Sequence, residues 1–258
     1  MTNSLELRTD REAAREPRLP TIGEQGRFWD WHWQHWRERN AISDWALKGG
    51  ERVVSILRSL ELDRPKILDM GCGIGWFSQE FSQYGEVTGI DLSEHAIAQA
   101  KASYPHIRFR VANALADPLP AGQFDVVISQ EVFAHVEDQA KYLQAAANTL
   151  RPGGYLIVTT ANRFVLDRLG DSMWKWPREH IETYHDMKSF KRLLSRSFRV
   201  LRTTTILPMG SVGILYFVNS RKVNKTLSLL IPERWLTALK ERAGLGYCMI
   251  ALAQRKDD

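Results

Sequence analysis

The stretch Lys66-Ile67-Leu68-Asp69-Met70-Gly71-Cys72-Gly73-Ile74-Gly75 joins a short apolar run to a glycine-rich loop. The run predicts a buried strand, and Trp76–Tyr84 after the loop predicts a helix. Glycines at such a turn let the backbone bend tightly and approach a ligand where any Cβ would collide. We therefore expect a cofactor-binding loop, with contacts from Asp69, Gly71, Cys72, Gly73 and Gly75.

The spacing of this loop separates two kinds of cofactor. It is Gly-x-Gly-x-Gly, whereas loops that hold the pyrophosphate of a dinucleotide have Gly-x-Gly-x-x-Gly. The carboxylate of Asp69 would repel a diphosphate, but it suits the ammonium and sulfonium groups of a zwitterionic amino-acid cofactor, directly or through its hydrogen bonds. The loop therefore favours a cationic cofactor over NAD.

Further cofactor contacts follow the next three predicted strands. Asp91 lies 20 residues after Gly71, the interval that a βαβ unit needs, and its carboxylate can accept hydrogen bonds from both ribose hydroxyls. Leu92 can then lie against an adenine face. The remaining expected contacts are Asn113 and Ala114 at the adenine edge, and Gln130 beside the sulfonium.

Strand-like and helix-like segments alternate around this region. The predicted strands are 66–70, 86–90, 107–111, 124–129, 154–160, 198–206 and 247–254, and the predicted helices are 43–60, 76–84, 93–103, 139–150, 187–197 and 233–243. Continuous apolar runs such as 126–128 are typical of strands covered on both faces. We expect an α/β fold with a Rossmann-like, seven-stranded, mostly parallel sheet, closed by an antiparallel pair.

These motifs, in this order and spacing, resemble the class I S-adenosylmethionine (SAM)-dependent methyltransferases over residues 60–160. The resemblance implies SAM as methyl donor and S-adenosylhomocysteine as product. We expect a methyltransferase domain at 61–258, preceded by a disordered arm at 1–20 and an aromatic-rich helical cap at 21–60. Insertions at 161–190 and 207–245 would then form a substrate lid.

Within that class, four segments are similar to the ubiquinone-biosynthesis O-methyltransferase group. They are Gln130–Asp138 (M-E-x-L-E-H-V-x-D in that group), Thr159–Arg163 (S-T-x-N-R), His185–Phe190 (H-D-x-x-K-F) and Trp36–Asn40 (W…R-x-N). The resemblance implies methylation of an oxygen on an aromatic, prenylated or natural-product metabolite, with carbon or nitrogen as alternative acceptors. We expect a cytoplasmic enzyme, and the sequence leaves open whether it is a monomer or a homodimer.

One departure from that group concerns a metal. Its members can hold a cation through Glu, Glu and His, but this chain has Ala134 between Glu131 and His135. Two protein ligands would hold a divalent ion weakly, so the sequence leaves metal dependence open.

Catalytic candidates follow from the need to position an acceptor and to remove its proton. His135 lies four residues after Glu131, so a helical turn would direct both side chains to one side. His180 and His185 fall in the first insertion, where either imidazole can serve as a base. The alternative for His135 is a hydrogen bond to the backbone or to the cofactor's surroundings, and for His180 and His185 it is a surface or capping position.

Aromatic residues before and after the core predict a substrate pocket. Trp29, Trp33 and Trp36 share one face of a helix. The alternative to a substrate pocket is a cap helix that packs on the sheet through these side chains. The substrate candidates are Trp29, Trp33, Trp36, Arg39, Trp174, Trp176 and Tyr184.

Composition limits the other classes of function. The net charge of +5 is modest and spread along the chain, and Gln130–Phe133 stands where base-flipping methyltransferases have Asn-Pro-Pro-Tyr, so we expect no nucleic-acid substrate. Cys72 and Cys248 suit a reducing cytoplasm. A protein methyltransferase, or a SAM-binding protein without turnover, stays an alternative.

No stretch predicts a transmembrane segment or a secretory signal. The longest apolar run, Ile206–Val218, is too short to span a bilayer. The stretch 206–235 combines apolar runs with Arg221, Lys222 and Lys225, which suits either a membrane surface or a solvated cap made of a strand and a helix; we favour the cap.

Overall fold

The protein is built on one seven-stranded sheet. The computed structural model describes residues 19–35, 44–169 and 180–256. The strand order is β3-β2-β1-β4-β5-β7-β6, with β1 to β5 parallel and β7 antiparallel to both of its neighbours. The strands are β1 (Lys66–Met70), β2 (Glu86–Asp91), β3 (Arg108–Val111), β4 (Phe124–Ser129), β5 (Leu150–Ala161), β6 (Phe198–Pro208) and β7 (Gly246–Arg255). The mostly parallel sheet and its antiparallel closing pair are confirmed.

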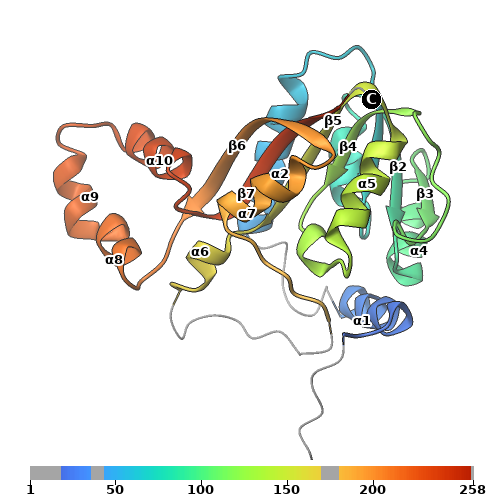
Figure 1. Ribbon diagram of the computed structural model, residues 1–258, viewed down its shortest axis with the longest axis horizontal. Coiled ribbons are helices and arrows are strands. Elements are labelled where there is room, and N and C mark those ends of the chain that lie inside the picture. Colours follow the sequence, from blue (N-terminus) through green and yellow to red (C-terminus); the bar gives the residue numbers. More distant parts are fainter. Residues whose placement is uncertain (1–18, 36–43, 170–179, 257–258) are drawn as a thin grey trace, which may run out of the picture.

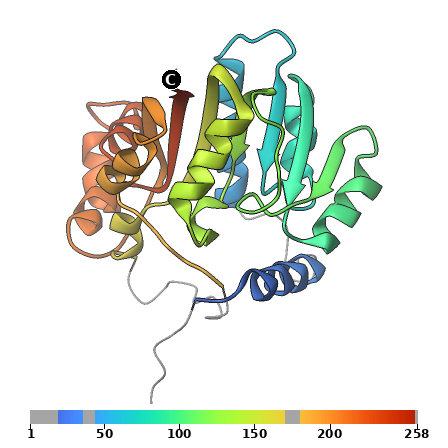
Figure 2. The ribbon, with the colours of Figure 1, turned by 45° about the vertical axis from the view of Figure 1, so that its right-hand side comes forward.

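Helices cover both faces of the sheet because each central strand is apolar on both sides. In β4, Val126 and Ile128 pack with the core that α2 supplies, whereas Val127 packs with the core that α5 supplies. Figures 1 and 2 show the two layers. The helices of these layers are α2 (Asp44–Arg58), α3 (Trp76–Phe81), α4 (Glu94–Ser103), α5 (Gln139–Thr149) and α7 (Met187–Leu194).

Helix α1 (Ile22–Gln34) crosses the edge of the sheet where the parallel strands end. A capping box starts it: Glu24 N–H donates to the Thr21 hydroxyl, and the Glu24 carboxylate accepts from Thr21 N–H at 2.7 Å. Phe28 and His32 form its buried side. The start of the helix at residue 22 satisfies the expectation of a helical segment in front of the core.

The chain after β6 agrees with expectation only in part. The predicted helix at 233–243 is present as α10 (Glu233–Arg242), but between it and β6 lie two helices that the sequence did not predict, α8 (Ile214–Asn219) and α9 (Arg221–Leu227). A further short helix, α6 (Arg163–Leu166), follows β5. Gly210 and Gly213 have positive φ angles, which break the apolar run and allow the turn into α8.

Several predictions stay untested by this description. Most of the predicted disordered arm, and the substrate candidates Trp36, Arg39, Trp174 and Trp176, lie outside the described residues. The lid role of 161–190 and 207–245 also stays a prediction. Over the described ranges, none of the helices is both long and apolar enough to cross a bilayer.

Candidate active site

The loop after β1 has the backbone geometry that its glycines predict. Gly71, Gly73 and Gly75 have φ angles of 83°, 51° and 80°, which side chains of L-residues disfavour. There is also no room for a side chain: a Cβ at Gly71 would lie 2.1 Å from a methyl of Val132, and one at Gly73 would lie 2.4 Å from the ring of Trp33. The loop is therefore in close contact with the end of β4 and with α1.

Asp91 fixes the loop to the end of β2. Its Oδ2 accepts a hydrogen bond from Gly73 N–H at 2.8 Å, and its Oδ1 accepts one from Ser93 N–H at 2.9 Å. Each carboxylate oxygen has a second lone pair, so these bonds leave acceptor capacity for a ligand. The carboxylate predicted to bind ribose thus lies directly beside the glycine loop.

Three acidic side chains at this edge of the sheet have raised pKa values. Burial raises the pKa of Asp69 to about 7, although the hydrogen bond from the Ser78 hydroxyl at 2.5 Å opposes the shift. Burial also raises the pKa of Asp91 and of Glu131. Within the described parts of the chain, these carboxylates accept hydrogen bonds from hydroxyl, thiol and backbone N–H groups, none of them cationic. A cationic ligand would therefore stabilise the ionised carboxylates, whereas a diphosphate would be repelled.

Gln130 has a buried oxygen that lacks a partner. Its Nε2 donates to the carbonyl oxygen of Ala46 at 3.4 Å, but its Oε1 has no hydrogen-bond partner among the described residues. An unpaired buried carbonyl is costly, and a cationic N–H group of a bound cofactor would satisfy it. Together with the glycine loop and Asp91, this oxygen fits the zwitterionic cofactor that the sequence predicts.

The other predicted cofactor contacts lie around this loop. Cys72 belongs to it, with N–H donating to the carbonyl oxygen of Ile90 at 3.0 Å. Leu92 lies under α1, 4.0 Å from the Cβ that a side chain at Gly26 would have. The side-chain oxygen of Asn113 accepts a hydrogen bond from Leu115 N–H at 2.9 Å, so it already has a local partner. Ala114 packs against the core.

Glu131 does not share a helical turn with His135, as the spacing predicted. It has a φ of 57°, and the helical residues begin only at Phe133, in the short 3-10 helix η2 (Phe133–His135). Its carboxylate accepts hydrogen bonds from the Thr159 hydroxyl at 2.7 Å and the Cys248 thiol at 3.2 Å. The expectation was wrong because the chain turns through a left-handed conformation at the end of β4.

His135 and His180 lie together under α1. Their rings are 5.3 Å apart, and Trp29 of α1 lies 5.1 Å from the ring of His135. His180 stacks on Phe28 at 4.4 Å with an angle of 6°. Two of the three predicted histidines and one predicted tryptophan thus form one cluster.

The hydrogen bond of His135 determines which ring nitrogen carries the proton. Nδ1 lies 2.8 Å from the carbonyl oxygen of Ile181, and because a carbonyl only accepts, Nδ1 donates and Nε2 keeps its lone pair. Burial lowers the pKa of His135 to about 4, so the imidazole is neutral at physiological pH.

His185 and Tyr184 occupy different surroundings. The Nε2 of His185 lies 2.6 Å from Oε1 of Gln139, while the backbone of His185 bonds Arg163. Tyr184 donates to Glu182 at 3.0 Å, and burial raises its pKa well above the usual range. His185 thus bonds to a side chain of α5, and its role as a base stays a prediction.

A metal site of the usual kind is not formed by the described residues. Across residues 19–35, 44–169 and 180–256, no three His, Cys, Asp or Glu side chains group in a way that would hold an ion. Ala134 is buried at the position where the resembled group carries its second Glu.

Three residues of the site were not predicted from the sequence. Asp30 of α1 accepts hydrogen bonds from the Ser93 hydroxyl at 2.6 Å and from His95 N–H at 3.1 Å, which attaches α1 to the start of α4. Thr159 and Cys248 hold Glu131. The signal for Asp30 is a carboxylate between two tryptophans of an aromatic-rich helix, but its partners lie more than 60 residues away.

Comparisons with known proteins find similarity in the central part of the chain. Residues 68–158 match a family model described as a methyltransferase domain. A ubiquinone biosynthesis O-methyltransferase of Marinobacter nauticus is 39% identical over 120 residues, which cover 43% of this chain and 50% of that protein. The chain thus spans about half the length of the curated relatives it matches.

Two solved structures share the fold. A SAM-dependent methyltransferase from Mesorhizobium loti has a TM-score of 0.56 at 22% identity, covering 78% of this chain and 96% of that one. The [4+2]-cyclase SpnF has a TM-score of 0.64 at 16% identity, covering 94% and 98%. At such identities the likeness shows the fold alone. The cyclase is an example of a protein with this fold whose name refers to a different reaction. With the matched domain, the fold and the curated relatives in agreement, the chain carries a SAM-dependent methyltransferase domain.

Proposed function

We propose that this protein transfers the methyl group of SAM to an oxygen of a small aromatic or prenylated molecule. When bound, SAM supplies an electrophilic methyl group on a sulfonium. The observation that carries the proposal is that α1 contacts both the Asp91-anchored glycine loop, through Trp33 at Gly73, and the neutral His135, through Trp29. The names of the O-methyltransferase relatives support oxygen as the acceptor atom.

The residues that would hold SAM are the glycine loop, Asp91 and Gln130. Asp91 would accept from the ribose hydroxyls with its remaining lone pairs, and the buried Oε1 of Gln130 would accept from the ammonium group. The ionised carboxylate of Asp69 would add attraction for the positive charge.

His135 would act on the acceptor. A hydroxyl becomes a better nucleophile as its proton leaves, and Nε2 of His135 is the lone pair available to receive that proton. The hydrogen bond to Ile181 would stabilise the imidazolium as it forms. Trp29, and the stacked rings of Phe28 and His180 to which it is nearly perpendicular, would supply aromatic walls for the acceptor, where water is scarce.

The test is a transfer assay with methyl-labelled SAM. The full chain is incubated with catechols, simple phenols and their prenylated forms, and with matched amines and carbon acids, and the products are identified by mass spectrometry. We expect label on a phenolic oxygen, with prenylated forms at least as good as simple ones. Label only on nitrogen or carbon would contradict O-methylation, and binding of SAM without transfer to any acceptor in the panel would favour a SAM-binding protein without turnover.

A further inference from the structure

Helices α8, α9 and α10 expose apolar side chains to an unusual degree. They project from the β6 side of the sheet, at the left of Figure 1. Of the fourteen large hydrophobic side chains exposed in the described chain, nine lie between residues 212 and 239: Val212, Ile214, Tyr216, Phe217, Val223, Leu229, Leu230, Trp235 and Leu239. We call these nine residues and the helices that carry them the α8–α10 surface.

The exposure is large for individual side chains. Leu229 and Leu230, between α9 and α10, are 81% and 85% exposed, and Phe217 and Trp235 are 65% and 59% exposed. Removing one such side chain from water shifts an equilibrium by about tenfold or more. Exposed apolar side chains concentrated in one segment in this way are typical of an interaction surface.

The same segment is strongly basic. Residues 212–242 contain six basic and two acidic side chains: Arg221, Lys222, Lys225, Arg234, Lys240 and Arg242, against Glu233 and Glu241. Glu241 is neutralised by Arg52 of α2 at 3.1 Å. Aromatic and aliphatic side chains set among lysines and arginines are typical of elements that lie in the interface of an anionic membrane.

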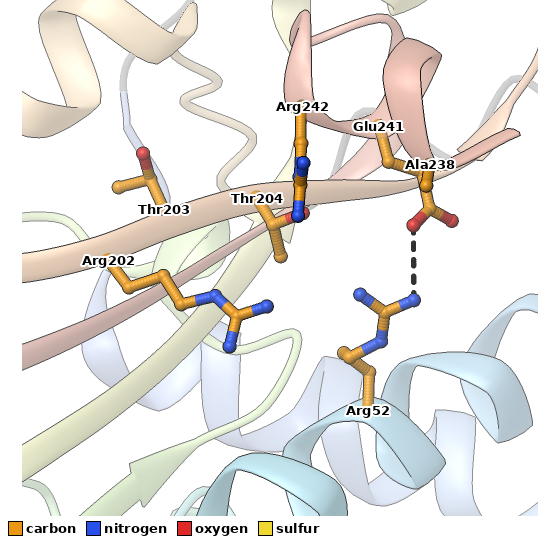
Figure 3. A pocket seen from close by; sticks show the side chains of 7 residues that line it. All are labelled: Arg52, Arg202, Thr203, Thr204, Ala238, Glu241 and Arg242. Atoms are coloured by element: carbon orange, nitrogen blue, oxygen red, sulfur yellow. Dashed lines mark hydrogen bonds and ion pairs between the residues drawn. The ribbon is translucent and has the colours of Figure 1, made fainter. Parts of the chain in front are cut away.

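A basic pocket adjoins this surface. Its volume is about 580 Å³, and α2, β6 and α10 form its walls. Figure 3 shows the side chains of Arg52, Arg202 and Arg242 converging on one space, where Glu241 is the single carboxylate of the lining. Arg242 follows Leu239 by three residues on α10, so the pocket begins where the apolar stripe of that helix ends.

We propose that the α8–α10 surface docks on an anionic phospholipid membrane. The apolar side chains enter the boundary between headgroups and acyl chains, and the basic side chains, including those at the pocket, contact lipid phosphates. A second copy of the chain is a poorer occupant, because it would bring six cations against six cations. The docking is independent of which acceptor is methylated.

Vesicle sedimentation of the full chain tests the docking. Vesicles of phosphatidylcholine alone are compared with vesicles in which about one third of the lipid is phosphatidylglycerol. We expect binding to the anionic vesicles, weak binding to the neutral ones, and loss of binding as salt rises. Equal binding to both vesicle types, or binding to neither, would overturn the proposal.

Apolar variants locate the contact. Phe217→Ser, Leu230→Ser and Trp235→Ser should each lower vesicle affinity about tenfold, while Leu19→Ser, at a residue that is also 59% exposed but lies before α1, should not. All four side chains are largely solvated, so unchanged melting temperatures and unchanged SAM binding establish that the variants fold. If the α8–α10 variants bind vesicles as well as the wild type does, the contact is not here.

Basic variants and the oligomeric state complete the test. Arg202→Gln and Arg242→Gln should each weaken binding to anionic vesicles about fivefold, whereas Arg196→Gln, which removes the same charge from an exposed site outside the pocket, should have a smaller effect. Equal effects of all three would overturn the role of the pocket. A dimer in light scattering that the serine variants dissociate would assign the α8–α10 surface to a second copy instead.

Discussion

The two halves of the candidate site are built in different ways. The donor half, the glycine loop and Asp91, comes from 21 consecutive residues of one βαβ unit, tied together by backbone hydrogen bonds. The acceptor half joins α1, the end of β4, the segment before α7 and the antiparallel strand β7. The donor site is thus formed by residues close together in the sequence, whereas the acceptor site depends on contacts between distant segments.

The largest effect is expected in the donor half. Asp91→Ala removes the acceptor of two backbone hydrogen bonds, from Gly73 and Ser93, together with the expected ribose contacts. Hydrogen bonds to a carboxylate contribute about 1.5–3 kcal/mol each, so SAM affinity should fall about a thousandfold. Calorimetry measures this, with the exposed Asp63→Ala as control. Unchanged affinity would remove Asp91 from the site.

In the acceptor half, a substitution at His135 should lower turnover and leave SAM binding nearly unchanged. His135→Gln removes the proposed base, so kcat should fall about a hundredfold while the Kd for SAM changes less than about twofold. Exposed His106→Gln is the matched control. Because the pKa of His135 is lowered to about 4, its protonation should leave kcat unchanged above about pH 5. A parallel loss of SAM affinity would show that His135 serves the donor half.

The sequence predicts the donor half better than the acceptor half, for the same reason. The glycine spacing and Asp91 were predictable because strand, loop and helix are adjacent in the chain. Asp30 was not predictable, because its hydrogen bonds depend on where α1 packs. The position of Glu131 was predicted wrongly, because its own left-handed backbone conformation breaks the helical spacing to His135. Helices α8 and α9 escaped prediction because little of their apolar surface packs on the core, which removes the periodicity that marks an amphipathic helix.

A pH series sharpens the electrostatic account of the donor half. The pKa of Asp69 is raised to about 7, so the carboxyl is mostly protonated at pH 6 and mostly ionised at pH 8. A cationic cofactor binds the ionised form better, so SAM affinity should rise up to about tenfold across this range. In Asp69→Asn the rise should be absent. Affinity that falls with rising pH in the wild type would contradict this role.

The smallest effect concerns the junction of the two halves. Asp30→Ala removes the hydrogen bonds that attach α1 to Ser93 and His95, and Trp33 of that helix lies over Gly73. Loosening α1 should raise the rate at which SAM dissociates about fivefold, followed in stopped flow by tryptophan fluorescence. Asp167→Ala, at an exposed position just after α6, is the control. An unchanged rate would mean that α1 does not cover the donor.

The most direct test of the account is a pair of calorimetric titrations of the wild-type chain, one with SAM and one with NAD. Both ligands carry an adenosine, but SAM is cationic and NAD has a diphosphate. The buried carboxylates of Asp69, Asp91 and Glu131 predict that one SAM binds per chain and that NAD neither binds nor competes. Competition by NAD at comparable affinity, or no heat from SAM, would contradict the central claim that this edge of the sheet is a SAM site.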